Sequence, residues 1–129
     1  MRSDERGQRG SAAVEFALLL PIALLLLLAF VQVGVLATDQ LLLTQASRAG
    51  AREAAVQPSE EAVVEAVRAA AAGLDGERIE VDVAWSGQRG APVTVSLVYD
   101  VRTAAALAGW LLPDAVTLRA TATMRQEFS

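Results

Sequence analysis

The chain has 129 residues and a formal net charge of −4, and it contains no Cys, no His and no Lys. This composition excludes disulfides, thiolate metal sites and His-based acid–base catalysis. The acidic balance argues against nucleic-acid binding, which needs a basic face. We therefore expect a protein that is not an enzyme and that takes no metal or other cofactor.

Residues 1–10 form a short basic leader that ends at Gly10. Its three Arg and two acidic residues give it a net charge of +1, so the chain without it carries −4 − 1 = −5. Ser11 follows, and Glu15 lies five residues past the glycine, at the start of an uncharged stretch. An ionised carboxylate beside lipid costs about 2 to 3 kcal/mol, so we expect the chain to use Glu15 there.

The uncharged stretch covers residues 16–38 and is mostly Leu, Ala and Val. As a helix, these 23 residues span about 34 Å, which is enough to cross the hydrocarbon core of a bilayer. Pro21 lies one turn inside and is expected to kink the helix locally. The Arg residues of the leader favour a cytoplasmic N-terminus. We predict a single-pass transmembrane helix over residues 11–38.

Two other interpretations of the apolar stretch stay open. One is a secretory signal peptide, since Val35-Leu36-Ala37 resembles a small-residue cleavage site. The apolar run exceeds the usual 7–15 residues of such a segment, and the apolar pattern continues past Ala37 without a break. The other is an uncleaved membrane anchor, with Glu15 reaching to the lipid headgroups.

Two segments resemble a known family. The segment Gly10–Leu18 looks like the processing site of type IV pilin-like proteins, and within those it most resembles the TadE-like family, the pseudopilins of tight-adherence (Tad/Flp) pilus systems. A second segment, Leu43–Ala55, resembles the Ala-Ala-Arg-x-Gly-Ala-Arg pattern of that family. Ser47 replaces one Ala of the pattern. The matching residues are Arg48, Gly50, Ala51 and Arg52.

The resemblance implies cleavage by a membrane prepilin peptidase between Gly10 and Ser11, on the cytoplasmic side. Ser11 would become the new N-terminus, where well-known type IV pilins carry Phe, so N-terminal methylation is not carried over. The implied partners are that peptidase, other pilins or pseudopilins, membrane lipid and an inner-membrane assembly platform with a cytoplasmic ATPase. The implied location is the cytoplasmic membrane, with the C-terminal part outside it and a place in a cell-surface pilus left open.

Cleavage would create an ammonium group at Ser11, one helical turn from the carboxylate of Glu15. In a fibre the carboxylate could instead meet the ammonium of a neighbouring subunit, which would neutralise both charges and set the axial register. Arg48 and Arg52 share a helix face beyond the membrane. They are either a solvated patch near a helix C-terminus or a docking site for an acidic partner.

The membrane helix is predicted to continue to Val56 as one helix of about 40 residues, half in lipid and half outside it, with Gly50 as its weak point at about 1 kcal/mol relative to Ala. Pro58 then breaks it. Ser59 is a natural N-cap for a second helix, which is expected to end at Gly73-Leu74-Asp75-Gly76.

Three later stretches alternate apolar and polar residues with period two, as strands with one wet face do. They cover residues 79–85, 93–101 and 116–124, with a hairpin loop from Ser86 to Pro92. We predict an α+β fold resembling a pilin-like lollipop: a long N-terminal helix, a second helix and a three-stranded antiparallel sheet. The predicted organisation is a leader at 1–10, a transmembrane helix at 11–38 and an extracytoplasmic head at 39–129.

Two further features are weaker. The segment from Thr103 to Asp114 holds Trp110-Leu111-Leu112, which is either a short helix packed on the sheet edge or an exposed apolar contact surface for other subunits. The acidic residues Asp75, Glu77 and Asp82 fit no known cation-binding loop.

We expect a minor pilin or pseudopilin that acts in pilus assembly by packing rather than by catalysis. The alternative is a single-pass, signal-anchored extracytoplasmic binding protein unrelated to pili, which would show no cut at Gly10 and no dependence on Glu15. A secreted enzyme released after Ala37 would need a carboxylate or Ser mechanism, and the sequence shows no constellation for one.

Overall fold

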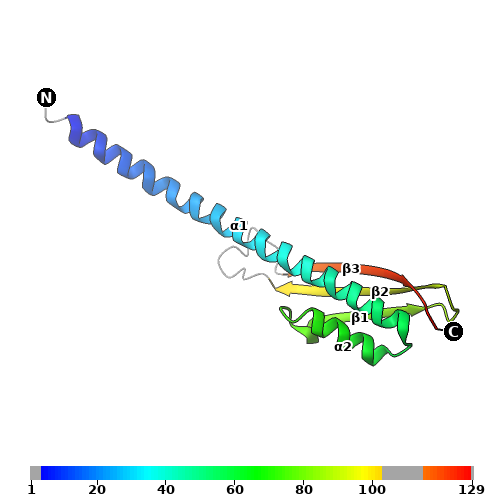
Figure 1. The fold of residues 1–129 in the computed structure, drawn as a ribbon. Coiled ribbons are helices and arrows are strands. Elements are labelled where there is room, and N and C mark those ends of the chain that lie inside the picture. The colour runs from blue at the N-terminus through cyan, green and yellow to red at the C-terminus, as the bar shows by residue number, and fades with distance from the viewer. Residues whose placement is uncertain (1–3, 103–114, 129) are drawn as a thin grey trace. The chain divides into compact units, whose positions relative to one another are not determined.

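The structure is a computed structural model that describes residues 4–102 and 115–128 (Figure 1). It divides into two compact units, Met1–Val35 and Leu36–Ser129. The described part confirms the predicted α+β fold of a long helix, a second helix and a three-stranded antiparallel sheet. The predicted short helix around Trp110 lies outside the described residues.

The long helix α1 covers Asp4–Val56 without a break in its helical assignment, and Pro21 lies inside it. Its 53 residues exceed the predicted length because the helix begins within the leader. It ends two residues before Pro58, as the steric restriction on the residue preceding a proline favours. Its first 32 residues, up to Val35, belong to the first unit, and the rest packs in the second.

Helix α2 covers Glu60–Ala70 and begins as predicted, because the Ser59 hydroxyl accepts a hydrogen bond from the Ala62 N–H at 3.3 Å. Its end was predicted too late. The helix stops at Ala70, and the Ala71 N–H donates to the Val67 carbonyl as a cap at 2.9 Å. The C-cap residue Ala71 leaves the helical conformation, with φ −98° and ψ 32°, although its side chain is still buried against the core.

A single turn of 3₁₀ helix, η1 (Gly76–Arg78), leads into the sheet. Strands β1 (Ile79–Trp85), β2 (Pro92–Arg102) and β3 (Ala115–Arg125) form an antiparallel sheet in the order β1-β2-β3. The prediction placed all three correctly, and β2 and β3 each extend one residue further at both ends. The β1–β2 loop turns through two glycines with positive φ, Gly87 at 73° and Gly90 at 80°.

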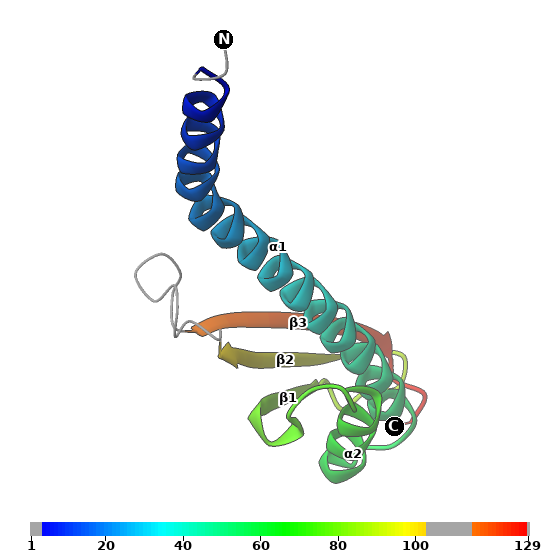
Figure 2. The same cartoon turned by 90° about the vertical axis from the view of Figure 1, so that its left-hand side faces the viewer.

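One face of the sheet carries the core. Alternate side chains of the central strand β2 are buried, as period two requires. The C-terminal half of α1 and helix α2 cover this face, and both views place that half of α1 next to β3 and α2 next to β1 (Figures 1 and 2). The buried residues of β2 are Val93, Val95, Leu97, Tyr99 and Val101. Those of α1 are Leu43, Ala46, Ser47, Gly50, Ala51, Ala54 and Ala55.

The C-terminal end of α1 is tied to both edge strands at one end of the sheet. The last carbonyls of a helix have no partner within the helix. Here the Trp85 indole Nε1–H donates to the Ala54 carbonyl at 3.2 Å, and the Glu127 N–H donates to the Ala55 carbonyl at 2.8 Å. Two carbonyls that would otherwise lack a partner beside the core are therefore satisfied by the last residue of β1 and by a residue that follows β3.

Candidate functional site

The predicted processing segment lies in the first unit, in helical conformation. Gly10, Ser11 and Glu15 are all exposed. A Cβ added at Gly10 would meet no other described group within 4 Å. The chain's own packing therefore gives no reason for a glycine at this position, where glycine weakens a helix by about 1 kcal/mol relative to Ala.

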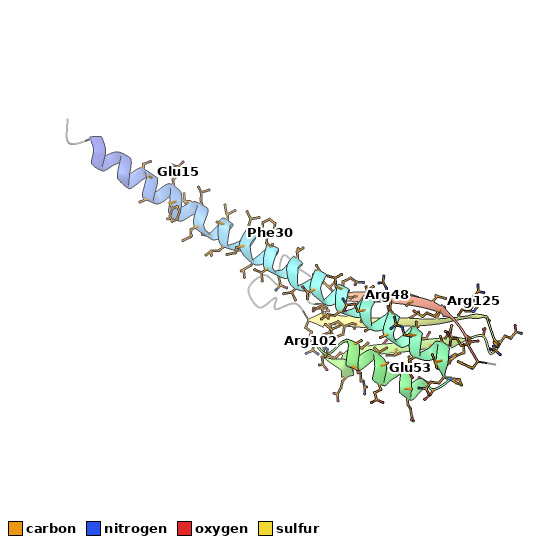
Figure 3. All side chains as sticks on the ribbon, in the orientation of Figure 1. Glu15, Phe30, Arg48, Glu53, Arg102 and Arg125 are labelled. Carbon is orange, nitrogen blue, oxygen red and sulfur yellow. The ribbon has the colours of Figure 1, made fainter. Side chains whose placement is uncertain are left out.

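Ser11 and Glu15 are four residues apart in α1, so their positions lie on one helix face about one turn apart. The Glu15 side chain extends from the helix into the surroundings (Figure 3). Within the described residues, the Glu15 carboxylate makes no hydrogen bond or ion pair. No described side chain therefore competes for this carboxylate, which was predicted to meet an ammonium group after cleavage.

The helix that follows Glu15 is apolar on every side. Side chains from Phe16 to Val35 project all round it, and Phe30 is 74% exposed (Figure 3). Among the described residues, this is one helix long and apolar enough to cross a membrane, within Gly10–Val56. A helix that is apolar all round is stable only when something apolar surrounds it. The first unit supplies no such cover, so lipid or the helices of other chains must provide it.

Arg48 and Arg52 lie on α1 in the second unit, and both are exposed. Figure 3 shows the position of Arg48 on the helix. Both Arg residues are two residues from Gly50, on either side, which turns them roughly away from the core that Gly50 faces. In the part of the chain that the structure describes, neither Arg is paired with an acidic side chain. Their guanidinium groups are free to meet a partner, and which partner they meet stays a prediction.

Gly50 has a role that the sequence did not reveal. A Cβ built on it would lie 2.7 Å from Cγ2 of Val67 and 3.3 Å from Cγ1 of Val95. These contacts come from α2 and β2, so Gly50 marks the place where two helices and the sheet approach most closely. The prediction had treated it as a weak point of an isolated helix, because its neighbours are distant in sequence.

Among the acidic residues considered for a cation site, Asp75 has another role. The Asp75 carboxylate accepts a hydrogen bond from the Glu77 N–H at 3.2 Å and so caps the η1 turn. Across the residues that the structure describes, no group of three or more potential ligands could hold a metal ion.

The comparison with protein families agrees with this arrangement. Residues 10–52 match the model of the family described as TadE-like protein. The match begins at Gly10, runs through the apolar part of α1 and ends at Arg52, so it confirms the resemblance to the TadE-like family. No curated protein and no solved structure shows significant similarity to the chain. The match and the apolar helix together fit a membrane-anchored protein related to Tad pili.

Proposed function

Because residues 10–52 match the TadE-like family, we propose that the chain is a minor pilin or pseudopilin that takes part in assembling a Tad-type pilus. A prepilin peptidase removes residues 1–10, and the helix from Ser11 onward keeps the protein in the cytoplasmic membrane. The head, from about residue 39, lies outside. The protein acts by packing against other subunits and not by catalysis.

The observation that carries this proposal is the extent of the family match, which includes both predicted sites. It starts at the glycine of the proposed cut and ends at Arg52, the second exposed cation of α1. A plain membrane anchor would need only the apolar residues between them. A match that covers Gly10, Glu15 and the Arg pair supports a role for the whole segment.

The surroundings of Gly10 support cleavage on physical grounds. A peptidase must reach the scissile carbonyl, and a peptide bond inside a helix has to unwind first. A glycine lowers the cost of unwinding by about 1 kcal/mol relative to Ala, and the absence of any neighbour within 4 Å leaves the bond accessible. The glycine is thus unexplained by packing and useful for processing.

Glu15 supplies the assembly step of the proposal. After the cut, the carboxylate lies one turn from the Ser11 ammonium of its own chain and can exchange it for the ammonium of a neighbour. In a low-dielectric setting, leaving either charge unpaired would cost several kcal/mol. A neighbour whose ammonium reaches Glu15 is therefore favoured over one displaced along the fibre.

The test is the intact mass of the protein isolated from membranes of cells with and without an active prepilin peptidase. We expect loss of residues 1–10 only when the peptidase is present, and no loss for Gly10→Val, whose added side chain meets no neighbour and leaves the fold unchanged. Gly34→Val is the matched control, since a Cβ added at Gly34 would also meet nothing within 4 Å. An uncut chain supports a signal-anchored binding protein instead, and a chain that starts at Thr38 supports a cleaved signal peptide.

A further inference from the structure

Strand β3 is an edge strand with backbone groups that the described chain leaves open. The Gly90 N–H donates to the Gln126 carbonyl at 2.9 Å, and the Gln126 N–H donates to the Ala91 carbonyl at 2.8 Å. Both backbone groups of Gln126 therefore point toward the residues that precede β2. Since this direction alternates along an antiparallel strand, the odd-numbered residues of β3 point their N–H and C=O groups outward.

The side chain of Gln40 agrees with this alternation. Its Nε2–H donates to the Arg119 carbonyl at 2.9 Å, which agrees with a carbonyl that points away from β2. No other hydrogen bond from the described residues reaches the outward backbone groups of β3. The strand has 11 residues and contains neither Pro nor Gly, so it lacks the usual devices that block pairing at an edge.

Strand β1 forms the opposite edge, and the register fixes which of its groups are open. Thr121 is paired with Ser96, and Ser96 is paired with Asp82. Because the backbone N–H and C=O of Thr121 point outward, those of Ser96 point toward β1, and those of Asp82 point back toward β2. The backbone groups of Val81 and Val83 therefore face outward at the β1 edge, and no other group among the described residues forms a hydrogen bond with them.

The two edges carry opposite charges on the same face of the sheet, the one turned away from the core. On β3 this face presents Arg119 and Arg125, both exposed. On β1 it presents Glu80 and Asp82, also exposed. The charged side chains of β3 within the described residues are all basic, and those of β1 are all acidic.

We propose that the β3 edge of one copy of this chain pairs with the β1 edge of a second copy, in parallel, so that the sheet continues from head to head. In a parallel ladder, a residue with outward groups bonds to the two neighbours of the residue opposite it. Arg119 can then lie opposite Glu80 of the second copy. The Arg119 N–H donates to the Ile79 carbonyl, and its own carbonyl, which has a second lone pair beside the one that Gln40 uses, accepts from the Val81 N–H. The pattern of outward groups on both strands fits this ladder.

The same ladder brings the opposite charges together. With Arg119 opposite Glu80, Asp82 of the second copy is the next residue along the same face, within reach of the long Arg side chain. All copies keep the C-terminal half of α1 in one direction, as copies anchored in one membrane by the same helix require. The contact is heterologous, so it can repeat from copy to copy.

Pairing of β3 with β3 of a second copy is the competing arrangement. A two-fold axis through Thr121, normal to the sheet, would place Arg119 opposite Thr123 and bring no carboxylate of β1 near it. It would also reverse the direction of α1 in one of the two copies. The opposite charges of the two edges and the common direction of α1 therefore both favour pairing of β3 with β1 over pairing of β3 with β3. The inference stands apart from the proposed function, because edge pairing needs no cut at Gly10.

The test is cysteine crosslinking of the full-length protein in membranes, where the Cys-free sequence provides a clean background. Ala84 and Thr123 are exposed, uncharged and opposite each other in the proposed register. With a mild oxidant, the double variant Ala84→Cys/Thr123→Cys should give a ladder of disulfide-linked oligomers. A direct disulfide joins Cα atoms no more than about 7 Å apart, so it cannot link these two positions within one chain, where Thr94 on β2 lies between them. A mixture of the two single variants should give a dimer and nothing larger, and each single variant alone should give no product. A dimer from Thr121→Cys alone, whose exposed residue lies on the two-fold axis, would establish the two-fold arrangement and overturn the proposal, as would the absence of a ladder.

Two further variants in the double-cysteine background separate pairing from chance encounter. Arg119→Glu should lower the yield of the ladder about fivefold or more, and Glu80→Arg/Asp82→Arg should restore it in that variant. Arg102→Glu is the matched control, because Arg102 lies on the central strand at the far end of the sheet from Arg125 (Figure 3). An equal loss for Arg102→Glu, or no loss for Arg119→Glu, would contradict the proposed contact.

Thr121→Pro tests the backbone bonds directly. Its N–H points outward, and Pro is tolerated at an edge where that group faces solvent. We expect the ladder of crosslinked oligomers to disappear in the double-cysteine background, while the thermal unfolding temperature stays close to that of the parent chain. Ala122→Pro removes an N–H that bonds to β2, so it should lower that temperature. A ladder of full yield from Thr121→Pro would show that the contact does not use this edge.

Discussion

A Cβ built on Gly50 lies 2.7 Å from Cγ2 of Val67, closer than side-chain carbons approach each other in folded proteins. The glycine lets α1 and α2 come together over β2 at a distance that no other residue permits. A small-residue stripe along α1 continues this close approach, with Ala46, Ala51 and Ala54 fully buried. The head is thus held together by backbone proximity as well as by apolar side chains.

We predict that Gly50→Ala destabilises the head, although Ala is the better helix former. The gain in helix propensity is about 1 kcal/mol, whereas an extra methyl group in a packed core costs about 1 to 3 kcal/mol. The stiff Val67 side chain has little freedom to move aside. The measurement is denaturant unfolding of the full-length protein in detergent, followed by Trp fluorescence.

The control for this prediction is the double variant Gly50→Ala/Val67→Ala. Because the Val67 methyl groups cause the clash, the two changes together should cost less than the sum of the separate changes. Additive losses would mean that the glycine acts through the helix backbone and not through its contact with Val67.

We predict that Trp85→Phe lowers stability by about 1 kcal/mol, because the Ala54 carbonyl loses the indole N–H that satisfies it. The aromatic ring, and most of the packing, remain. Hydrogen exchange should also rise for amides in the last turn of α1, which the Trp85 bond helps to hold.

Tyr99→Phe is the matched control for this change. Tyr99 is 7% exposed, and within the described residues its hydroxyl makes no hydrogen bond, so its removal should leave exchange in that turn unchanged. If Trp85→Phe behaves like Tyr99→Phe, the 3.2 Å contact to Ala54 contributes nothing to the end of α1.

We predict that Ser59→Ala costs about 1 kcal/mol, since it removes the side-chain acceptor that caps α2. Ser59→Asp should keep the cap and retain most of the stability, despite the nearby Glu60 and Glu61. Thermal unfolding of the two variants beside the parent chain is the measurement. Equal unfolding temperatures for the Ala and Asp variants would show that the 3.3 Å bond to Ala62 has no energetic role.

Much of the fold could be predicted from the sequence because its signals are local. Period two located the three strands to within one residue, and Pro58 and Ser59 marked the boundary between the helices. The end of α2 could not be located in this way. The Ala-rich sequence favours further helical turns, and the helix stops at Ala70 although the next residue, Ala71, is still buried.

The features that the sequence did not reveal depend on residues far apart in the chain. Gly50 is explained by Val67, which lies on another helix, and the opposite charges of the two sheet edges require the strand order. Gly10 and Glu15 could be proposed because glycine, carboxylate and apolar run follow one another directly. Their function was inferred from a resemblance, which the family match supports.

We predict that Glu15→Gln leaves cleavage at Gly10 and membrane insertion intact but weakens association with other pilin-like subunits. Removing the charge lowers the cost of placing this position beside lipid by about 2 to 3 kcal/mol, so insertion should not suffer. Because the ammonium group of a neighbouring subunit loses its partner, smaller amounts of other subunits should co-purify with the protein after mild crosslinking.

The matched control for Glu15→Gln is Glu53→Gln, a carboxylate on the same helix α1 that lies in the head. It should leave co-purification at the level of the parent chain. Glu15→Asp keeps the charge but shortens the reach by one methylene, so it should fall between the parent and Glu15→Gln. If all three variants co-purify equally well with other subunits, the carboxylate has no role in assembly, and Glu15 is an ordinary anchor residue at the lipid headgroups.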